Sequence, residues 1–188
     1  NTLCSWFCQR AGLQRDLNGS WDGKGCERVA VSVLTALEPA CSGKVTYVEG
    51  AKSAGSDKSG FAAAIAAAKR ADVVVAVLGE GWYMSGEASS RTNLSLPGVQ
   101  PELLAELHQT GKPIVLVLFA GRPLTLAPVL PDADAVLLAW FPGTMGGPAI
   151  VDLLTGAVSP SGKLPVTFPR VLGQVPIYDA HKMTGRPI

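Results

Sequence analysis

The sequence predicts an α/β domain built on a doubly wound, mostly parallel sheet with helices on both faces. Two segments, at 72–78 (DVVVAVL) and 113–119 (PIVLVLF), are unbroken apolar runs, which are typical of strands buried on both faces. A third apolar segment follows at 133–140 (ADAVLLAW). Helical patterns separate these strands in units of about 30 residues, as expected for a parallel sheet with crossover helices.

Composition limits the class of protein. The chain has 188 residues, a net charge of +1 and 16% charged residues, enough for one domain around a single large core. So small a charge gives no electrostatic argument for binding nucleic acid or an anionic membrane. No apolar run reaches the roughly 18 residues of a membrane-spanning helix, and residues 1–12 do not resemble a signal peptide. We therefore expect a soluble protein.

The first half of the chain predicts a strand and a helix before the first buried strand. Residues 44–49 (KVTYVE) are typical of a short strand, and residues 59–70 (SGFAAAIAAAKR) of an Ala-rich helix. Asp57 and Ser59 are candidate caps for the start of that helix. Two basic residues at its end suit the negative end of the helix dipole.

The second half adds two helices and an irregular C-terminus. Leucines at helical spacing predict a helix at 97–110, which ends at Gly111. A Gly-rich turn leads into a second helix at 148–154. Three prolines in residues 159–170 favour an edge strand or hairpin there. Residues 171–188 form a predicted tail.

The cysteine pattern predicts no metal centre. The cysteines are Cys4, Cys8, Cys26 and Cys41. Only the first two are close in sequence, and both histidines lie far away, whereas a metal site needs close pairs. We expect thiols, with a disulfide as the alternative. The Gly-rich turn after the third strand matches neither common phosphate-binding spacing, so no cofactor is predicted.

The candidate functional segment is the loop that leaves the buried strand at 72–78. Open α/β sheets bind ligands beyond the carboxyl ends of their strands, and a loop of about 18 residues inside a compact domain is usually functional. Its chemically active side chains are two carboxylates, a guanidinium and two aromatic rings: Glu80, Glu87, Arg91, Trp82 and Tyr83.

The residues of this loop leave alternatives open. Glu87 and Arg91 are four residues apart, so a short helical turn would pair them as an ordinary surface ion pair. Glu80 directly follows the strand and is an alternative functional carboxylate, or a cap of the next turn. His108, on the helix at 97–110, is expected at the surface.

A longer pattern identifies a family. The segments GEGWYMSGEASSRTNLSLPGVQPELL, TGKPIVLVLFAGRPL, ADAVLLAWFPGTMGGPAIVDLLTG and SPSGKLPVTFPRVLGQVPIY resemble, in order and spacing, the second domain of family 3 glycoside hydrolases, especially bacterial β-glucosidases. The resemblance covers about residues 15–187. It implies a flavodoxin-like three-layer sandwich that follows a (β/α)8 barrel in the family. We expect residues 1–188 to be this one domain, without the barrel.

The N-terminus departs from the family pattern. Family members begin this domain with an apolar strand ending in Gly-Pro and then reach a Gly-Ser-Trp stretch. Gly19, Ser20 and Trp21 fit this stretch, whereas residues 1–14 are atypical. Because the first strand of a doubly wound sheet is central, the segment LCSWF must substitute for it or another segment must.

The resemblance implies a retaining glycosidase that acts on a β-glucoside or oligosaccharide. Such enzymes need two carboxyl groups about 5–5.5 Å apart, and in this family the nucleophile is an Asp on the barrel. Ser85, Glu87 and Arg91 match the family motif S-G-E-x-x-x-R, which makes Glu87 the acid/base candidate. Trp82 and Tyr83 are candidates for an aromatic wall against sugar rings. The expected partner is the missing barrel or a second copy of the chain, and family members are often periplasmic or secreted.

An alternative is a stand-alone hydrolase, such as a carboxylesterase acting on a small ester. It would use one of three loop serines with one of the two histidines: Ser85, Ser89 or Ser90 with His181 or His108. A serine nucleophile needs a base within hydrogen-bond reach and an acid that orients the base. The sequence has no G-x-S-x-G elbow.

Overall fold

The computed structural model describes residues 4–8, 14–23, 27–178, 180 and 182. Within them lies a five-stranded sheet of order β2-β1-β3-β4-β5 in which every neighbouring pair is parallel. The strands are β1 (Cys4–Cys8), β2 (Val45–Glu49), β3 (Val73–Gly79), β4 (Ile114–Phe119) and β5 (Ala135–Leu138). This is the flavodoxin-like strand order, so the predicted fold class is confirmed.

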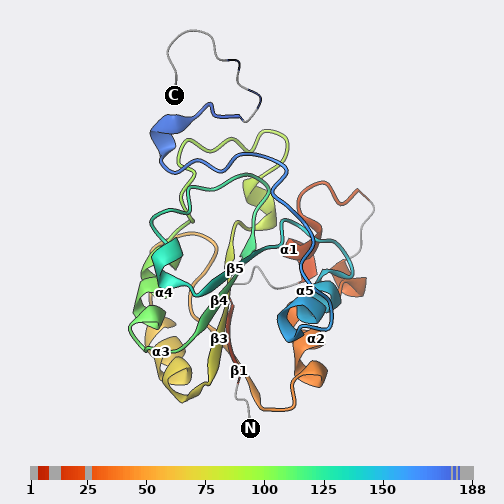
Figure 1. The fold of residues 1–188 in the computed structure, drawn as a ribbon, viewed down its shortest axis with the longest axis vertical. Coiled ribbons are helices and arrows are strands. Elements are labelled where there is room, and N and C mark those ends of the chain that lie inside the picture. The colour runs from red at the N-terminus through yellow and green to blue at the C-terminus, as the bar shows by residue number, and fades with distance from the viewer. Residues whose placement is uncertain (1–3, 9–13, 24–26, 179, 181, 183–188) are drawn as a thin grey trace.

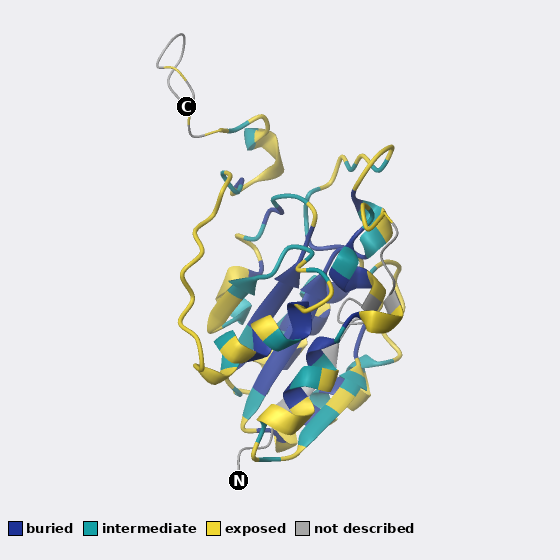
Figure 2. Cartoon of the chain, turned by 90° about the vertical axis from the view of Figure 1, so that its right-hand side faces the viewer, coloured by how far each residue is buried: buried dark blue, intermediate teal, exposed yellow. Residues whose placement is uncertain are grey.

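Helices cover both faces of the sheet (Figure 1). The helices are α3 (Phe61–Arg70) and α4 (Gln100–His108) on one face, and α1 (Gln14–Asn18), α2 (Val33–Ala40) and α5 (Gly146–Thr155) on the other. Alternate residues of β3 enter the two cores: Val74 packs with the α3 and α4 side, and Val75 with the α2 and α5 side. Figure 2 shows the resulting buried strands at the centre of the molecule.

The N-terminal segment CSWFC (Cys4–Cys8) supplies the interior strand that the family pattern places at the start of this domain. Residues Cys4–Cys8 of β1 pair in parallel with β2 on one side and with β3 on the other. The side chains of Cys4 and Cys8 lie outside the described residues, as do all of Cys26 and His181. Cys41, which follows α2, is a half-buried thiol.

Two local predictions are wrong. Residues 159–170 form no strand or hairpin but an irregular segment, because each proline removes a backbone donor that a strand would need. Neither Asp57 nor Ser59 caps α3, whose N-cap is Gly60. Instead, Asp57 Oδ1 accepts a hydrogen bond from the Ser59 backbone N–H at 2.9 Å. This bond, together with the Ser59 hydroxyl and the Lys52 ammonium group, lowers the pKa of Asp57 to about 2.

Helices α1 and α2 lacked a clear sequence signal. Helix α1 has only five residues, and α2 contains Pro39, so neither shows a long apolar repeat. Helix α2 is stabilised by its packing against α5 and by a cap, in which Ser32 Oγ accepts a hydrogen bond from the Thr35 N–H at 3.1 Å. None of the described helices is long and apolar enough to cross a bilayer.

The α2 cap gives a stability prediction. Replacing the buried Ser32 with Ala removes the acceptor for the Thr35 N–H. We expect a loss of about 1 kcal/mol in the free energy of unfolding, measured by urea denaturation. Ser56→Ala, at an exposed serine, is the control and should change stability by less than about 0.5 kcal/mol. Equal losses in the two variants would contradict a role for the cap.

Candidate active site

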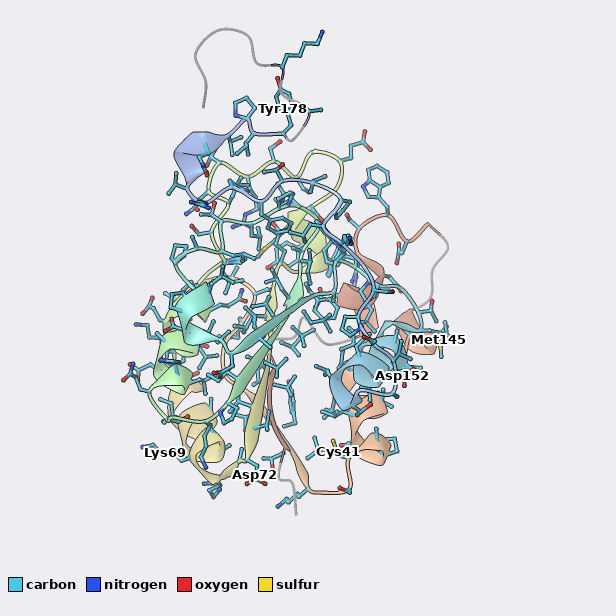
Figure 3. The ribbon with its side chains drawn as sticks, viewed as in Figure 1. Cys41, Lys69, Asp72, Met145, Asp152 and Tyr178 are labelled. Carbon is cyan, nitrogen blue, oxygen red and sulfur yellow. The ribbon has the colours of Figure 1, made fainter. Side chains whose placement is uncertain are left out.

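The loop that follows β3 lies at the carboxyl edge of the sheet. Lys69 and Asp72 mark the opposite, amino edge, and Tyr178 lies beyond the carboxyl edge (Figure 3). Glu80 directly follows β3, and Gly121 lies two residues after β4. In a parallel sheet these positions share one edge. The loop therefore occupies the place where ligands bind in this fold.

Glu80 anchors the loop. Its side chain is fully buried, and its Oε1 lies 2.6 Å from Arg91 Nη1 and 3.0 Å from Arg122 Nε. Its Oε2 accepts a hydrogen bond from the Gly121 N–H at 3.0 Å. Because the carboxylate is enclosed and paired with two guanidinium groups, it ties the loops after β3 and β4 together. It is not exposed to a substrate.

Arg91 takes part in this anchor. Besides Glu80, it donates a hydrogen bond from Nη2 to the Ser95 carbonyl oxygen at 3.0 Å. The alternative of an ordinary ion pair between Glu87 and Arg91 is therefore wrong, since Arg91 pairs with Glu80. This choice follows from burial: an enclosed carboxylate needs a counter-charge far more than an exposed one does.

Glu87 is exposed and lines a polar pocket of about 290 Å³. The pocket is lined by Ser20, Trp21, Trp82, Tyr83, Ser85, Glu87 and Ser89. It thus contains all of the predicted site residues except Arg91. It also brings in Ser20 and Trp21 from the Gly-Ser-Trp stretch, more than 60 residues earlier. The sequence signal for these two was the match of that stretch to the family pattern.

The pocket wall is held by contacts between distant segments. Trp82 donates its backbone N–H to Asp16 Oδ1 at 2.8 Å, and the Arg15 guanidinium carbon lies 3.8 Å from the centre of its ring. Both partners belong to α1, which follows β1. The pocket therefore lies at the topological switch point between β1 and β3, where doubly wound sheets bind ligands.

The other aromatic ring and the base of the pocket are also fixed. The Tyr83 hydroxyl lies 3.1 Å from Ser53 Oγ, and its ring meets Trp82 edge-on at 5.9 Å. Ser20 Oγ donates to the Ser85 carbonyl oxygen at 2.5 Å. Ser85 itself is buried, so it supports the pocket floor rather than projecting into open solvent.

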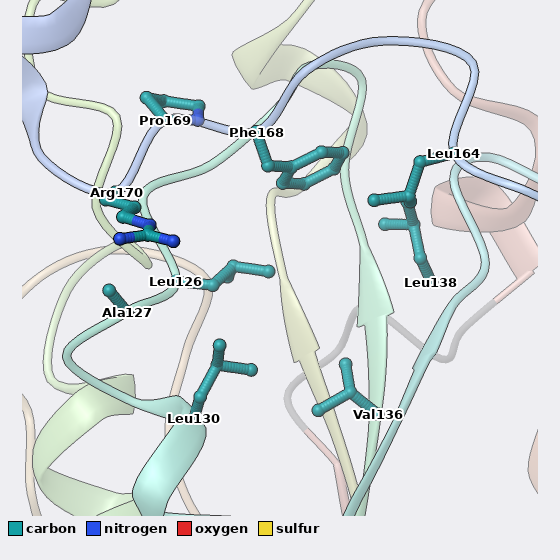
Figure 4. A pocket seen from close by; sticks show the side chains of 9 residues that line it. All are labelled: Leu126, Ala127, Leu130, Val136, Leu138, Leu164, Phe168, Pro169 and Arg170. Carbon is teal, nitrogen blue, oxygen red and sulfur yellow. The ribbon is translucent and has the colours of Figure 1, made fainter.

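A larger cavity, of about 330 Å³, lies elsewhere (Figure 4). Its lining is mostly apolar and consists of Leu126, Ala127, Leu130, Val136, Leu138, Leu164, Phe168, Pro169 and Arg170. It contains no carboxylate, thiol or histidine, and therefore lacks a group able to transfer a proton near neutral pH. We place the candidate site at the Glu87 pocket for this chemical reason.

Of the two candidate bases of the serine hydrolase alternative, His108 lies at the wrong edge of the sheet. His108 ends α4, which runs back towards the start of β4, so His108 lies near the amino edge. Ser85 and Ser89 lie at the carboxyl edge. His108 therefore cannot activate them, and it is exposed as predicted. The pairing with His181 lies outside the described residues, which also contain no group of three or more potential metal ligands.

Fold and pocket together define an α/β sandwich domain with a carboxylate and aromatic rings at its switch point. Residues 11–187 match the Glycosyl hydrolase family 3 C-terminal domain, and the chain belongs to this family. It is 44% identical over 199 residues to the periplasmic β-glucosidase of Salmonella typhimurium, covering 94% of this chain and 26% of that protein. A β-xylosidase from Formosa agariphila is 40% identical over 149 residues, covering 78% and 21%.

Solved structures of β-glucosidases are also similar to this chain over part of their length. The β-glucosidase from Listeria innocua superimposes with a TM-score of 0.90 and 36% identity, covering 100% of this chain and 25% of that one. That enzyme has also been solved in complex with laminaribiose and with glucose. The present chain therefore spans about a quarter of the length of these relatives.

Proposed function

We propose that this chain is the part of a retaining β-glycosidase that supplies the acid/base carboxyl group, Glu87. The supporting observation is the contrast between the two carboxylates of the loop. Glu80 is buried and neutralised by two arginines, whereas Glu87 is exposed and lines a pocket with three aromatic side chains. Only Glu87 of this pair can reach a substrate.

In this proposal Glu87 acts twice. It first donates its proton to the glycosidic oxygen while a carboxylate on the other part of the enzyme attacks the sugar. It then accepts a proton from the water that hydrolyses the glycosyl-enzyme intermediate. The attacking carboxylate belongs to a barrel domain, as the family resemblance implies.

The proposed substrate is a β-glucoside or a related β-linked oligosaccharide. Relatives that match this chain include β-glucosidases and β-xylosidases, and one was solved with laminaribiose. The rings of Trp21, Trp82 and Tyr83 line the Glu87 pocket. They offer apolar faces on which the C–H groups of a sugar can pack.

The test requires a complete enzyme. This chain would replace the matching segment of the Salmonella typhimurium β-glucosidase, and Glu87→Ala would be introduced into the chimera. Removing a general acid costs about 10²–10⁴ in rate. We expect this loss for alkyl glucosides, whose leaving group needs a proton, and a much smaller loss in the glycosylation step for dinitrophenyl glucoside, which needs none. Added azide should restore turnover of dinitrophenyl glucoside and yield the β-glucosyl azide.

Glu106→Ala, at an exposed position on α4, is the control and should retain the activity of the chimera. An equal loss for both substrates in the Glu87 variant, without azide product, would show that Glu87 is not the acid/base. Ester hydrolysis by the unaltered chain, abolished by His181→Ala, would instead support the carboxylesterase alternative.

A further inference from the structure

Arg122, in the loop after β4, contacts the Glu87 loop from a separate part of the chain. We propose that Arg122 is a positioning residue that fixes the orientation of Glu87 for proton transfer. This inference rests on the proposed function and adds to it a residue that does not touch the substrate.

The guanidinium group of Arg122 bridges the two sides of the Glu87 turn. Its Nη2 donates hydrogen bonds to the backbone carbonyl oxygens of Met84 and of Ser89, the latter at 2.8 Å. These residues lie three positions before and two positions after Glu87. A single rigid group therefore closes the segment 84–89 into a loop with Glu87 near its tip.

The backbone next to Glu87 needs such a restraint. Gly86 has φ 108° and Ala88 has φ 58°, so both neighbours of Glu87 adopt positive φ. Ala88 has a side chain, and this region is unfavourable for residues other than Gly. An unrestrained loop would relax away from this conformation, and the direction of the Glu87 side chain would change with it.

The contacts of Arg122 differ from those of Arg91. Arg91 Nη1 makes the hydrogen-bonded ion pair with Glu80. Arg122 Nε lies 3.0 Å from the same oxygen but is not aligned for a hydrogen bond. The hydrogen bonds described for Arg122 go to the carbonyl groups beside Glu87. Arg91 therefore neutralises the Glu80 carboxylate, while Arg122 connects Glu80 to the turn that carries Glu87.

A lysine at position 122 would keep the positive charge but lose the planar group that reaches two carbonyl oxygens and Glu80 together. The test compares Arg122→Lys and Arg122→Met in the chimera with the Salmonella typhimurium enzyme. A small misplacement of a catalytic group can cost about 10²-fold in rate. We expect Arg122→Lys to lower kcat for alkyl glucosides by about 10- to 100-fold, with KM little changed.

The loss in kcat should depend on the leaving group, as we also expect for Glu87→Ala. It should be small for the glycosylation step of dinitrophenyl glucoside. Arg70→Lys, at the exposed end of α3, is the control and should retain the activity.

The outcomes separate the two proposals. If Glu87→Ala shows no leaving-group dependence, the proposed function fails. If Glu87→Ala shows it and Arg122→Lys does not, only the positioning role fails. Equal losses for both substrates in Arg122→Lys, together with a lowered melting temperature, would mean that Arg122 only stabilises the fold. If Arg122→Met does not fold, the Arg122→Lys variant alone decides whether Arg122 has the positioning role.

Discussion

Replacing Glu80 with Gln should destabilise the domain by about 3–5 kcal/mol, the usual cost of removing one partner from a buried ion pair. Its carboxylate is fully buried and contacts both Arg91 and Arg122, whose side chains are only 19% exposed. Gln keeps the shape but removes the charge. Two guanidinium groups would then share an enclosed site without an anion, and the loops after β3 and β4 would separate.

Urea denaturation of the chain measures this effect, with Glu102→Gln as the matched control. Glu102 pairs with Lys58 at the surface, where both side chains are more than half exposed, so its loss should cost at most about 1 kcal/mol. Similar values for the two variants would refute the anchoring role of Glu80. The double variant Glu80→Gln with Arg122→Met should recover part of the loss, since one unpaired cation is removed.

Replacing Gly79 with Ala should destabilise the domain about as much as Glu80→Gln does. Gly79 ends β3 with φ 138°, a conformation available almost only to Gly. An added Cβ would lie 1.8 Å from the Phe119 carbonyl oxygen on β4. The backbone of Gly79 is also held by the buried Gln100 side chain, which bonds its N–H at 2.7 Å and its C=O at 2.9 Å. The Gly79 backbone therefore cannot shift away from Phe119 without disturbing its bonds to Gln100.

We expect a loss of about 2–6 kcal/mol for Gly79→Ala, combining backbone strain with overpacking. Gly111→Ala is the control, because Gly111 has φ 70° but no atom within 4 Å of its added Cβ. That variant carries the backbone strain alone and should lose about 1–2 kcal/mol. Equal melting temperatures of the two variants would show that the close approach to Phe119 does not limit this position.

Sequence patterns predicted the elements that are long, apolar and continuous. β3 and β4 were recognisable because both of their faces are buried, so each residue in the run is apolar. Helix α3 was recognisable from its alanines. Helix α2, with its internal proline, was not recognisable, because packing against α5 rather than local propensity stabilises it. Segment 159–170 was predicted as a strand or hairpin, but its prolines remove the backbone donors that a strand needs.

The two carboxylates of the loop after β3 also show what the sequence left open and the structure decided. From sequence alone, Glu80 and Glu87 were both candidates, and Arg91 lay at the right spacing to pair with Glu87. The structure pairs Arg91 with Glu80 and adds Arg122 from the next loop. No local spacing indicates that Arg122 lies beside a carboxylate 42 positions earlier in the chain.

By itself, the sequence determined the parallel α/β core and the family, and it singled out the segment that we propose carries the chemistry, because apolar runs and a long motif are local properties. Only the tertiary structure decided which carboxylate is buried, which is exposed, and which residues surround the exposed one. The physical reason is that burial and ion pairing depend on where the ends of separate strands meet, and the parallel sheet brings together residues far apart in the chain.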